Sequence, residues 1–415
     1  MRTQTILNQI TDYKGFIFTT DKFINDPNNK RIEVTIRHRK NSKGLCSKCH
    51  QVAPGYDTQP QREFQFIPVW NIPVIFLYPP RRVSCPEHGV VIEHMPWSNG
   101  KSPITLPFMW FLSAWAKLLS WQQVARSFNV NWVQVYESVS MAVEWGRNHM
   151  DLNGITAIGV DEVYCFKNKF MTVVYQINKG VKRLLYISED RTEASFRGFF
   201  EWFGTDNSKL IEYVCSDMWR PFLKVIKEKC VNAVNILDRY HVVAKLNKAL
   251  DEIRASEHKT IQKDGTISIL KNSRWCLLKR PENLTDTQSI KLKELLACNL
   301  KTIRGYLLKE ELDFFWKYVS VACAKKFLKK WTTKVMRSRL EPMKKVAKTI
   351  RNHEDLILNW FSARNHISLG AVEGLNNKIK SVTKRSYGFR NPEVLKIAMY
   401  HALGNLTTPK FTHIF

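Results

Sequence analysis

The chain has 415 residues, more than one hydrophobic core usually serves, so we expect several structural units. Its 64 Lys and Arg against 37 Asp and Glu give a formal charge of +27, which exceeds the needs of solubility and favours a polyanionic partner. An apolar fraction of 44% excludes general disorder, and the apolar stretches Phe66–Pro80 and Thr105–Trp121 are too short and too interrupted to span a membrane.

The N-terminal part, residues 1–100, carries two Cys/His pairs. A strand is expected at Arg31–Arg37, where polar and β-branched residues alternate. The pairs follow as Cys46-Ser-Lys-Cys49 and Cys85-Pro-Glu-His88. Four such ligands complete a tetrahedron and leave no position open for catalysis, so we expect a structural Zn²⁺ ribbon. His50 or His94 could compete as ligands, and unliganded buried cysteines are the alternative.

The compartment follows from the same region and from cysteine usage. Nine cysteines, an odd number spread over a long chain, argue against a secreted disulfide framework. The segment Met1–Gly15 lacks an apolar signal-peptide core. We therefore expect a cytoplasmic protein.

Residues 101–150 contain a candidate helix-turn-helix at Ser120–Tyr136. Val124, Ala125 and Phe128 would pack inward, Asn129–Asn131 would form the turn, and a recognition helix would open at Trp132 for a DNA major groove. Asn replaces the usual turn glycine but tolerates the same backbone region. Any amphipathic helix pair shares this pattern, and the chain's charge favours the DNA-binding interpretation. The residues expected to face DNA here are Gln122, Arg126, Asn131, Trp132 and Gln134.

Beyond a helix ending near His149, the periodicity changes to that of a mixed α/β sheet. The expected strands are Ile155–Val160, Phe170–Ile177, Leu184–Ser188, Ile211–Cys215 and Ala233–Leu237, with a hairpin turn at Asn178-Lys-Gly180 and helices near Glu193–Phe203 and Arg220–Lys229. The order βββαβαβ therefore predicts an α/β fold.

From His241 to about Asn365 no strand signal returns, which indicates an all-helical insertion. Its most basic part, Lys325–Arg351, interleaves Phe327 and Trp331 with cations. This pattern is typical of a solvated helix face over a small core, or of a surface that faces DNA, and the charge of the chain favours the latter.

Three acids end three predicted strands: Asp161, Asp217 and Asp238. Side chains at strand ends point into the cleft outside a sheet's edge, and clustered carboxylates suit Mg²⁺ or Mn²⁺. For Asp161 and Asp217 the alternative is a helix N-cap.

Glu373 begins a periodic helix whose inner stripe is Leu375, Ile379 and Val382. It shares another face with Asn377, Lys380 and Lys384, so a metal-binding acid would lie beside phosphate-binding side chains. That combination suits phosphodiester chemistry with two metal ions. Taken alone, an exposed helical Glu is the more common case.

The chain resembles bacterial insertion-sequence transposases of the ISL3 type over nearly its whole length. The blocks that carry the resemblance, besides the ribbon and the helix-turn-helix, are Gly159-Val-Asp161-Glu, Ser216-Asp217-Met-Trp-Arg-Pro221, Asp238-Arg-Tyr-His241, Glu373-Gly-Leu-Asn-Asn-Lys-Ile-Lys380 and Gly388-Phe-Arg-Asn391. The resemblance implies an RNase-H-like core interrupted by the insertion, with Asp161, Asp217 and Glu373 as catalytic Mg²⁺ ligands. It also implies recognition of the terminal inverted repeats of the chain's own element.

The expected organisation follows from this resemblance. The ribbon occupies 1–100, the helix-turn-helix 101–150, the first part of the core 151–244, the insertion 245–365, and the C-terminal part of the core with Glu373 366–415. Asp238 and His241 would support the site or be structural. Trp275 could stack on a displaced base or pack in the core, and Arg385 completes the DNA-facing residues.

The function expected is that of a DDE-type DNA transposase, which cleaves DNA strands and transfers them to target DNA by two-metal phosphoryl transfer. Because two transposon ends must meet, we expect a homodimer or a larger assembly on double-stranded DNA. A DNA-binding regulator with an inert core and a plain metal-dependent nuclease remain the alternatives.

Overall fold

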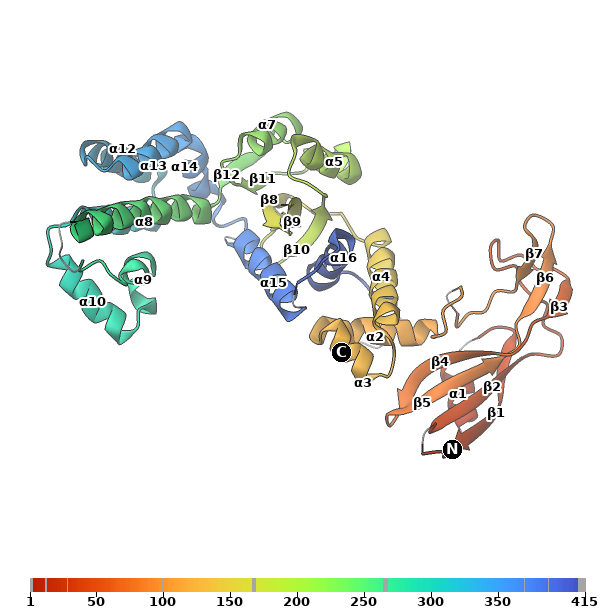
Figure 1. Ribbon diagram of the computed structural model, residues 1–415. Coiled ribbons are helices and arrows are strands. Elements are labelled where there is room, and N and C mark those ends of the chain that lie inside the picture. Colours follow the sequence, from red (N-terminus) through yellow and green to blue (C-terminus); the bar gives the residue numbers. More distant parts are fainter. Residues whose placement is uncertain are drawn as a thin grey trace. The chain divides into compact units, whose positions relative to one another are not determined.

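The computed structural model describes residues 3–11, 13–27, 29–98, 100–165, 169–263, 268–368, 370–386 and 388–409 (Figure 1). The chain forms two compact units, Met1–Met150 with Val382–Phe415, and Asp151–Ser381. Each unit is described by itself. Among the described helices, none combines the length and the apolar character needed to cross a membrane.

A four-stranded sheet, preceded by a short helix, opens the first unit. Its elements are α1 (Thr3–Ile10), β1 (Phe16–Ile24), β2 (Arg31–His38), β4 (Arg62–Val69) and β5 (Ile72–Tyr78). The strand order is β1-β2-β5-β4, with β2 and β5 parallel and the other neighbours antiparallel. Phe18, Phe64, Phe76 and Trp97 lie in its core, which alternate positions of the strands fill. The strand expected at Arg31–Arg37 is confirmed as β2, whereas the other three strands of this sheet were not predicted.

A smaller antiparallel sheet carries the Cys/His pairs. Its strands, in the order β3-β6-β7, are β3 (Gly55–Thr58), β6 (Arg81–Cys85) and β7 (Gly89–Ile92). Buried Glu93 joins it to the larger sheet: Oε1 accepts the Tyr78 hydroxyl at 2.5 Å, and Oε2 pairs with Arg81 Nη2 at 2.6 Å. A buried carboxylate paired in this way costs little only while both partners remain, so the network fixes how the two sheets meet.

Four helices complete the first unit: α2 (Leu106–Leu118), α3 (Trp121–Ser127), α4 (Trp132–Asn148) and α16 (Pro392–Leu403). Helix α4 packs against both α2 and α16. A Cβ at Gly146 would lie 2.6 Å from Leu406 Cβ, so glycine is needed for the segment after α16 to pass α4. The guanidinium of Arg147 lies 4.4 Å from the ring centroid of Tyr400 and adds a cation–π contact to this packing.

The second unit is built on a mixed five-stranded sheet. Its strands are β8 (Ala157–Tyr164), β9 (Phe170–Gln176), β10 (Arg183–Ile187), β11 (Tyr213–Ser216) and β12 (Val234–Leu237). The order is β10-β9-β8-β11-β12: the first three strands are antiparallel neighbours, whereas β8, β11 and β12 run parallel. All five predicted strands are confirmed, with ends shifted by up to four residues, and the α/β class is confirmed with them.

Helices cover this sheet. They are α5 (Glu193–Phe203), α6 (Thr205–Lys209), α7 (Arg220–Lys229) and α15 (Ala371–Arg385). Helices α5 and α7 pack through Phe196 and Phe222, whose ring centroids lie 5.2 Å apart. Helix α15 approaches β8 so closely that a Cβ at Gly159 would lie 2.4 Å from Val372 Cγ2. Glycine at 159 therefore allows the first turn of α15 to rest on the central strand.

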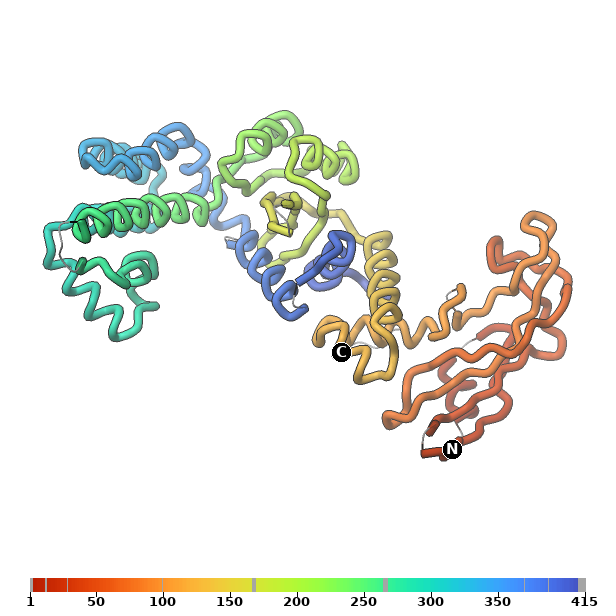
Figure 2. The backbone as a smooth tube through the Cα atoms, in the orientation of Figure 1, coloured from red at the N-terminus to blue at the C-terminus, as the bar shows by residue number. Residues whose placement is uncertain are grey.

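Between β12 and α15 the described chain is helical, as expected. The elements are α8 (Arg239–Lys263), α9 (Arg274–Leu278), η1 (Pro281–Asn283), α10 (Asp286–Leu296), α11 (Lys301–Asp313), η2 (Phe314–Lys317), α12 (Val321–Arg337), α13 (Glu341–Asn352) and α14 (Glu354–Ala363). Helix α8 leaves the end of β12 and packs against α11 and α13, and α14 returns to lie against β12 (Figure 2). The insertion thus begins and ends beside the same strand.

Candidate functional site

Three carboxylates share one edge of the five-stranded sheet. Cys215 of β11 pairs with Gly159 of β8 and with Ile236 of β12. Two residues further along each strand come Asp161, Asp217 and Asp238. Because side chains alternate between faces with period two, this register places the three carboxylates on one face of three neighbouring strands.

The position of Asp161 differs from the expectation. It was expected to follow a strand, but β8 continues to Tyr164, and Asp161 pairs with Val173 of β9. The hairpin partner β9 extends β8 beyond the point where β11 ends at Ser216. Asp161 therefore still lies at the edge of the parallel strands, although it is inside an antiparallel ladder.

The carboxylates of Asp217 and Asp238 are half-buried beside other acidic side chains. Burial raises the pKa of Asp217 above its ordinary value, and the charge of Asp161 raises it further. Burial likewise raises the pKa of Asp238, with smaller contributions from Asp161 and Glu373. Such shifts cluster at functional sites because folding alone gives little reason to gather buried acids.

Each of these two aspartates also accepts a backbone amide. Asp217 Oδ1 accepts the N–H of Trp219, and Asp238 Oδ1 accepts the N–H of Tyr240, both at 2.9 Å. The N-cap interpretation is wrong for Asp217, because α7 begins at Arg220 with Trp219 as its N-cap and without a side-chain cap hydrogen bond. It is wrong for Asp161 as well, because β8 continues to Tyr164 and Asp161 Oδ1 accepts the neighbouring N–H of Glu162.

His241 faces the same carboxylates from the first turn of α8. Its Nε2 lies 3.7 Å from Asp161 Oδ1. Burial alone would lower the pKa of His241, but the nearby carboxylate of Asp161 and the charges of Asp238 and Asp217 raise it above the ordinary value. The raised pKa favours the imidazolium form, which would supply positive charge among the acids.

The other oxygen of Asp161 is held by a short chain of hydrogen bonds. Asn376 of α15 donates from Nδ2 to Asp161 Oδ2 at 2.6 Å, and the hydroxyl of Tyr175 on β9 donates to Asn376 Oδ1 at 2.6 Å. Tyr175 is fully buried. Because both partners are fixed, the carboxylate of Asp161 has one preferred orientation.

Glu373 lies in the first turn of α15, where it reaches the same edge of the sheet. It lines a cavity of about 350 Å³ together with Asp238, Tyr240 and Trp360. Within the inner stripe expected for this helix, Leu375 and Ile379 are buried and Val382 is half-buried. The packing of α15 on β8 therefore brings Glu373 into the neighbourhood of the aspartates.

The acids gather without closing on one point. Among the described residues, only one group of three or more His, Cys, Asp and Glu side chains has its ligand atoms within 4.8 Å of one another, and it lies in the ribbon. The carboxylates of Asp161, Asp217 and Glu373 therefore do not all lie within this distance of one another. They share a site by charge and by register.

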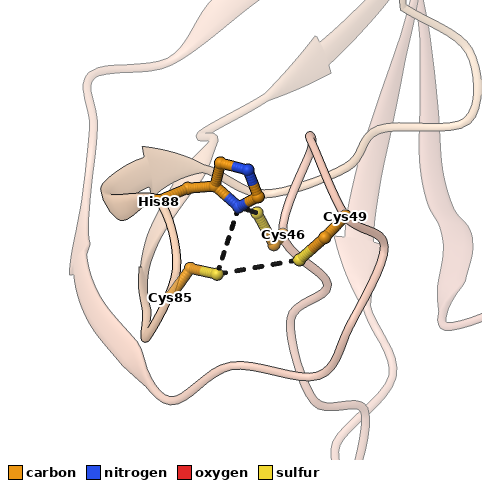
Figure 3. Close-up of side chains that lie close together, drawn as sticks. All are labelled: Cys46, Cys49, Cys85 and His88. Atoms are coloured by element: carbon orange, nitrogen blue, oxygen red, sulfur yellow. Dashed lines mark hydrogen bonds between the residues drawn. The ribbon is translucent and has the colours of Figure 1, made fainter.

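That tight group consists of Cys46, Cys49, Cys85 and His88 (Figure 3). Cys49 Sγ lies 3.7 Å from Cys85 Sγ, and His88 Nδ1 lies 3.6 Å from Cys85 Sγ and 3.8 Å from Cys46 Sγ. Four ligands about 2.3 Å from a tetrahedral zinc would be separated by about 3.8 Å, so the cluster could hold this ion. Hydrogen bonding by the backbone N–H of Cys49 lowers the pKa of Cys46 to about 6, which favours the thiolate that zinc requires.

The two competing histidines lie outside this cluster. The rings of His50 and His94 pack edge to face, with centroids 4.5 Å apart. His50 has a positive φ of 59° and ends the turn that starts at Cys46, whose carbonyl accepts the His50 N–H at 3.0 Å. The geometry therefore favours the ligand set that the Cys/His spacing predicted.

The segment Ser120–Tyr136 forms two helices joined by a tight turn. Val124 and Ala125 of α3 are buried, and half-buried Phe128 packs against Phe111 with ring centroids 5.0 Å apart. Asn129 has φ 50°, the left-handed conformation that a glycine usually supplies, and α4 begins at Trp132. The geometry of this segment thus agrees with the helix-turn-helix expected from the sequence.

The residues expected to face DNA in this motif differ in their freedom. Gln122 and Arg126 are exposed. Asn131 and Gln134 form a capping box, in which each side-chain oxygen accepts the other residue's backbone N–H at 2.8 Å. Trp132 stacks on Tyr136 at 5.6 Å between centroids and is 38% exposed. Only part of each of these three side chains is therefore available to a ligand.

The remaining expected DNA contacts are also mixed. Asn377, Lys380 and Lys384 are exposed on α15. Arg385 instead donates from Nη1 to the carbonyls of Lys117 and Leu118 at 3.1 Å, which caps the C-terminus of α2. Trp275 is 54% exposed beneath the guanidinium of Arg274, so packing in the core, the alternative for this residue, is wrong.

Comparison with known proteins adds the family. The family model DDE_Tnp_ISL3, described as "Transposase", matches residues 158–399, more than half of the chain. The chain belongs to the ISL3 family of transposases. It is 26% identical to the transposase of insertion sequence element IS1001 of Bordetella parapertussis, over 84% of this chain and 86% of that protein. It is 27% identical to the transposase of IS1557 of Mycobacterium tuberculosis, over 91% of this chain and 90% of that protein.

The matched segment of this ISL3 transposase contains every acid at the sheet edge. It also contains two residues that the sequence analysis missed, Asn376 and Tyr175. Asn376 belongs to the quoted block that starts at Glu373, three residues further on and thus on a neighbouring part of the same face. The sequence signal was present, but Asn377, one position later, was chosen instead. For Tyr175, in a fully buried strand, no signal distinguished it from core.

Proposed function

We propose that this ISL3 transposase cleaves DNA at the ends of its own insertion sequence and joins them to target DNA, in a reaction that depends on divalent metal. The observation that carries the proposal is the register of Asp161 and Asp217 on neighbouring strands, with Glu373 on the helix that packs against the first of them. The strand order β10-β9-β8-β11-β12 supports an RNase-H-like core, because an antiparallel triplet is followed by two parallel strands.

The residues present fit Mg²⁺ or Mn²⁺. The half-buried carboxylates of Asp217 and Asp238 keep raised pKa values although His241, and for Asp217 also Lys245, acts to lower them, and oxygen ligands are those that these hard cations prefer. Asp161, Asp217 and Glu373 would hold the metal. When bound, such ions supply charge stabilisation for the attacking and leaving oxygens of an in-line phosphoryl transfer.

The other side chains of the site would orient the proposed metal ligands and reduce the repulsion among the acids. Asn376 fixes the orientation of the Asp161 carboxylate, and Tyr175 fixes Asn376. The raised pKa of His241 favours its protonated form, which would limit the repulsion among the acids from its place 3.7 Å from Asp161 Oδ1. The charge of Glu373 contributes to the raised pKa of Asp238, and both residues line the same cavity. We therefore assign Asp238 a supporting role.

Outside the core, the proposal includes a structural zinc and a DNA-binding surface. Cys46, Cys49, Cys85 and His88 would hold Zn²⁺, because their separations match a tetrahedron. Helix α4 would enter a major groove of the terminal repeats, with exposed Arg126 and Gln122 of α3 nearby on the backbone. Two ends would require at least two copies of the chain on double-stranded DNA.

The test is an excision assay with a donor plasmid that carries the element. Asp161→Asn, Asp217→Asn and Glu373→Gln should each abolish excision, because each removes a charged metal ligand with little change of shape. Binding to end-bearing duplexes, measured by mobility shift, should remain. Glu201→Gln, on an exposed position of α5, is the matched control and should excise normally. Full excision by any of the three variants would remove that residue from the proposed site.

A further inference from the structure

A cationic groove lies in the helical insertion, between α11 and α12, and none of its lining residues belongs to the carboxylate site. Helix α12 is part of the basic stretch Lys325–Arg351 that the sequence led us to expect at a DNA-facing surface. The groove has a volume of about 780 Å³. Six cationic side chains line it: Arg304, Lys326, Lys329, Lys330, Lys334 and Arg337. We propose that this groove binds the phosphate backbone of double-stranded DNA. The proposal rests on the proposed function in one respect, that DNA is the substrate of the chain.

Five of the six cations have no counter-charge in the protein. The single acid of the groove, Glu311, pairs with Lys334 at 2.7 Å. In the described part of the chain, the side chains of the other five form no ion pair and no hydrogen bond, and all five are exposed. Unpaired like charges held together repel one another, so an arrangement of this kind is stable only beside an anionic partner or in solvent.

The spacing along α12 selects for an extended polyanion. Lys326, Lys330 and Lys334 recur every four residues, and Lys329 and Arg337 fill the same face. From 326 to 337 the helix rises about 16 Å at 1.5 Å per residue. One DNA strand advances about 3.4 Å per phosphate, so the row covers about five phosphates. A single free phosphate or nucleotide would occupy only a small part of it.

The walls of the groove are built into the core of the insertion. Trp331 of α12 is 1% exposed, and its Nε1 donates to the carbonyl of Leu308 on α11 at 2.9 Å. Half-buried Phe327 packs against Tyr318, with ring centroids 5.4 Å apart. The two aromatic residues of α12 thus anchor the helix from beneath, and neither lines the groove.

This packing indicates whether the groove contacts the bases or the phosphate backbone of DNA. Proteins that bind single strands present aromatic rings on which bases stack, and the described lining of this groove contains none. Lysine side chains are flexible point charges suited to phosphate oxygens. The groove therefore favours the backbone of a duplex, without sequence preference.

The first measurement uses the full-length wild-type chain in buffer without divalent metal. Lysines are labelled chemically with and without a duplex of arbitrary sequence, about three helical turns long, and the sites are read by mass spectrometry. Lys326, Lys329 and Lys330 should be protected by the duplex. Exposed Lys259 and Lys345, on α8 and α13, should be labelled equally in both samples. Equal labelling of the groove lysines with and without duplex would overturn the proposal.

The second measurement compares a triple variant with a matched control. Lys326→Gln/Lys330→Gln/Arg337→Gln should reduce the steepness of log Kd against log salt by about 2 to 3, because each lost phosphate contact removes about 0.9. Lys259→Gln/Lys293→Gln/Lys345→Gln removes the same charge from exposed positions outside the groove and should change the slope less. Circular dichroism verifies that both variants are folded. The same slope in both variants would contradict the proposal.

Two further outcomes distinguish this proposal from binding of an acidic protein segment and from the proposed function. If polyglutamate protects the groove lysines and the duplex does not, the partner is an acidic protein segment and the proposal is wrong. Because no metal and no transposon end is used, the result is independent of catalysis. Protection of the groove in a chain that fails to cleave ends would leave the groove standing and refute the proposed function. Cleavage of ends by the wild-type chain without protection of the groove lysines would refute the groove proposal and support the proposed function.

Discussion

Asn376 and Asp161 come from segments 215 residues apart, yet a 2.6 Å hydrogen bond joins them. The bond matters because it holds one carboxylate oxygen while the other faces His241. A ligand whose orientation is set in advance binds metal with a smaller entropic cost, and loss of such a partner typically lowers metal affinity by about 10–100-fold. Asn376 is therefore a positioning residue in this account.

At this scale we predict that Asn376→Ala raises the Mn²⁺ concentration needed for half-maximal cleavage by roughly tenfold. Tyr175→Phe should cause a smaller change, since it removes only the bond that orients Asn376. Metal binding read directly by electron paramagnetic resonance should shift in parallel, and binding to end DNA should not. Asn377→Ala, one exposed position further along α15, is the control. An unchanged metal response in Asn376→Ala would refute the positioning role.

How far single residues could be predicted depended on what set their positions. Asp217 and Asp238 directly follow short apolar runs that form β11 and β12. The pattern of apolar residues in the sequence was therefore enough to predict that both lie at the sheet edge. Asn376 and Asn377 could not be separated in the same way. Both lie one turn after Glu373, and which of them meets Asp161 depends on the contact between Val372 and Gly159, a tertiary feature.

The ribbon has only a small hydrophobic core of its own. The hydrophobic cluster of the β3-β6-β7 sheet contains Cys46, Ala53, Val83 and Cys85, so two of its four members are proposed zinc ligands. A core this small rarely holds a fold without a metal or a disulfide. The sheet should therefore depend on zinc.

We accordingly expect about one zinc per chain by elemental analysis, and loss of this zinc in Cys85→Ser. The ribbon strands β3, β6 and β7 should then become sensitive to protease, while the β8–β12 sheet stays resistant. Cys323→Ser, at an exposed cysteine of α12, is the matched control and should keep the metal. A zinc-free wild-type chain with a protected ribbon would count against the assignment.

Helix α16 contains a buried histidine, His401, that the fold keeps neutral. Burial, together with the charges of Lys117 and Arg385, lowers the pKa of His401 to about 3, although a hydrogen bond with the backbone of Ser113 acts to raise it. The unfolded chain binds a proton near pH 6.5, whereas the folded chain does not until about pH 3. Stability is therefore lost as the pH falls below about 6.5.

The size of this loss is predictable. Lowering the pH from about 7 to about 5.5 should cost wild type about 1 kcal/mol more than His401→Leu, because the variant has no group to protonate there. The comparison is made on the opening free energy of α16, measured by hydrogen exchange at both pH values. Equal pH dependence in the two proteins would show that His401 does not titrate as described.

The elements of the two sheets were not equally predictable. In the second unit each strand is a short apolar run bounded by polar residues, and the five runs became β8 to β12. In the first unit the stretch Phe66–Pro80 was taken as one apolar segment, but it contains the turn of the β4–β5 hairpin. Trp70 and Asn71 form that turn with φ values of 49° and 63°. Neither is glycine, so the usual hairpin signal was absent.

For the whole molecule, the sequence predicted the class of each part and not the order of its strands. The succession βββαβαβ is compatible with several sheets, and only the pairing of β11 with β8 makes β8 central and aligns Asp161 with Asp217. The proximity of residues on either side of the long insertion, which runs from β12 to α14, also depends on tertiary contacts. Glu373 becomes a neighbour of Asp238 because α14 returns to β12, a contact between residues more than 100 positions apart.

The charge of +27 is also a property of the whole chain. Part of it is used within the fold, as in the pairs of Arg81 with Glu93 and Arg239 with Asp313. Much of the rest is exposed without a counter-charge, most densely in the groove of α11 and α12. This distribution is expected of a protein that binds an extended polyanion along more than one surface.

The most direct test of the central claim uses the purified chain, a duplex that carries an end of its element, and a target plasmid. With Mg²⁺, mapped products should show cleavage at the end and joining of its 3′-hydroxyl to the target. Both should disappear with EDTA and in Asp161→Asn, Asp217→Asn and Glu373→Gln. Joining that persists in EDTA, or in any one of these variants, would contradict the account.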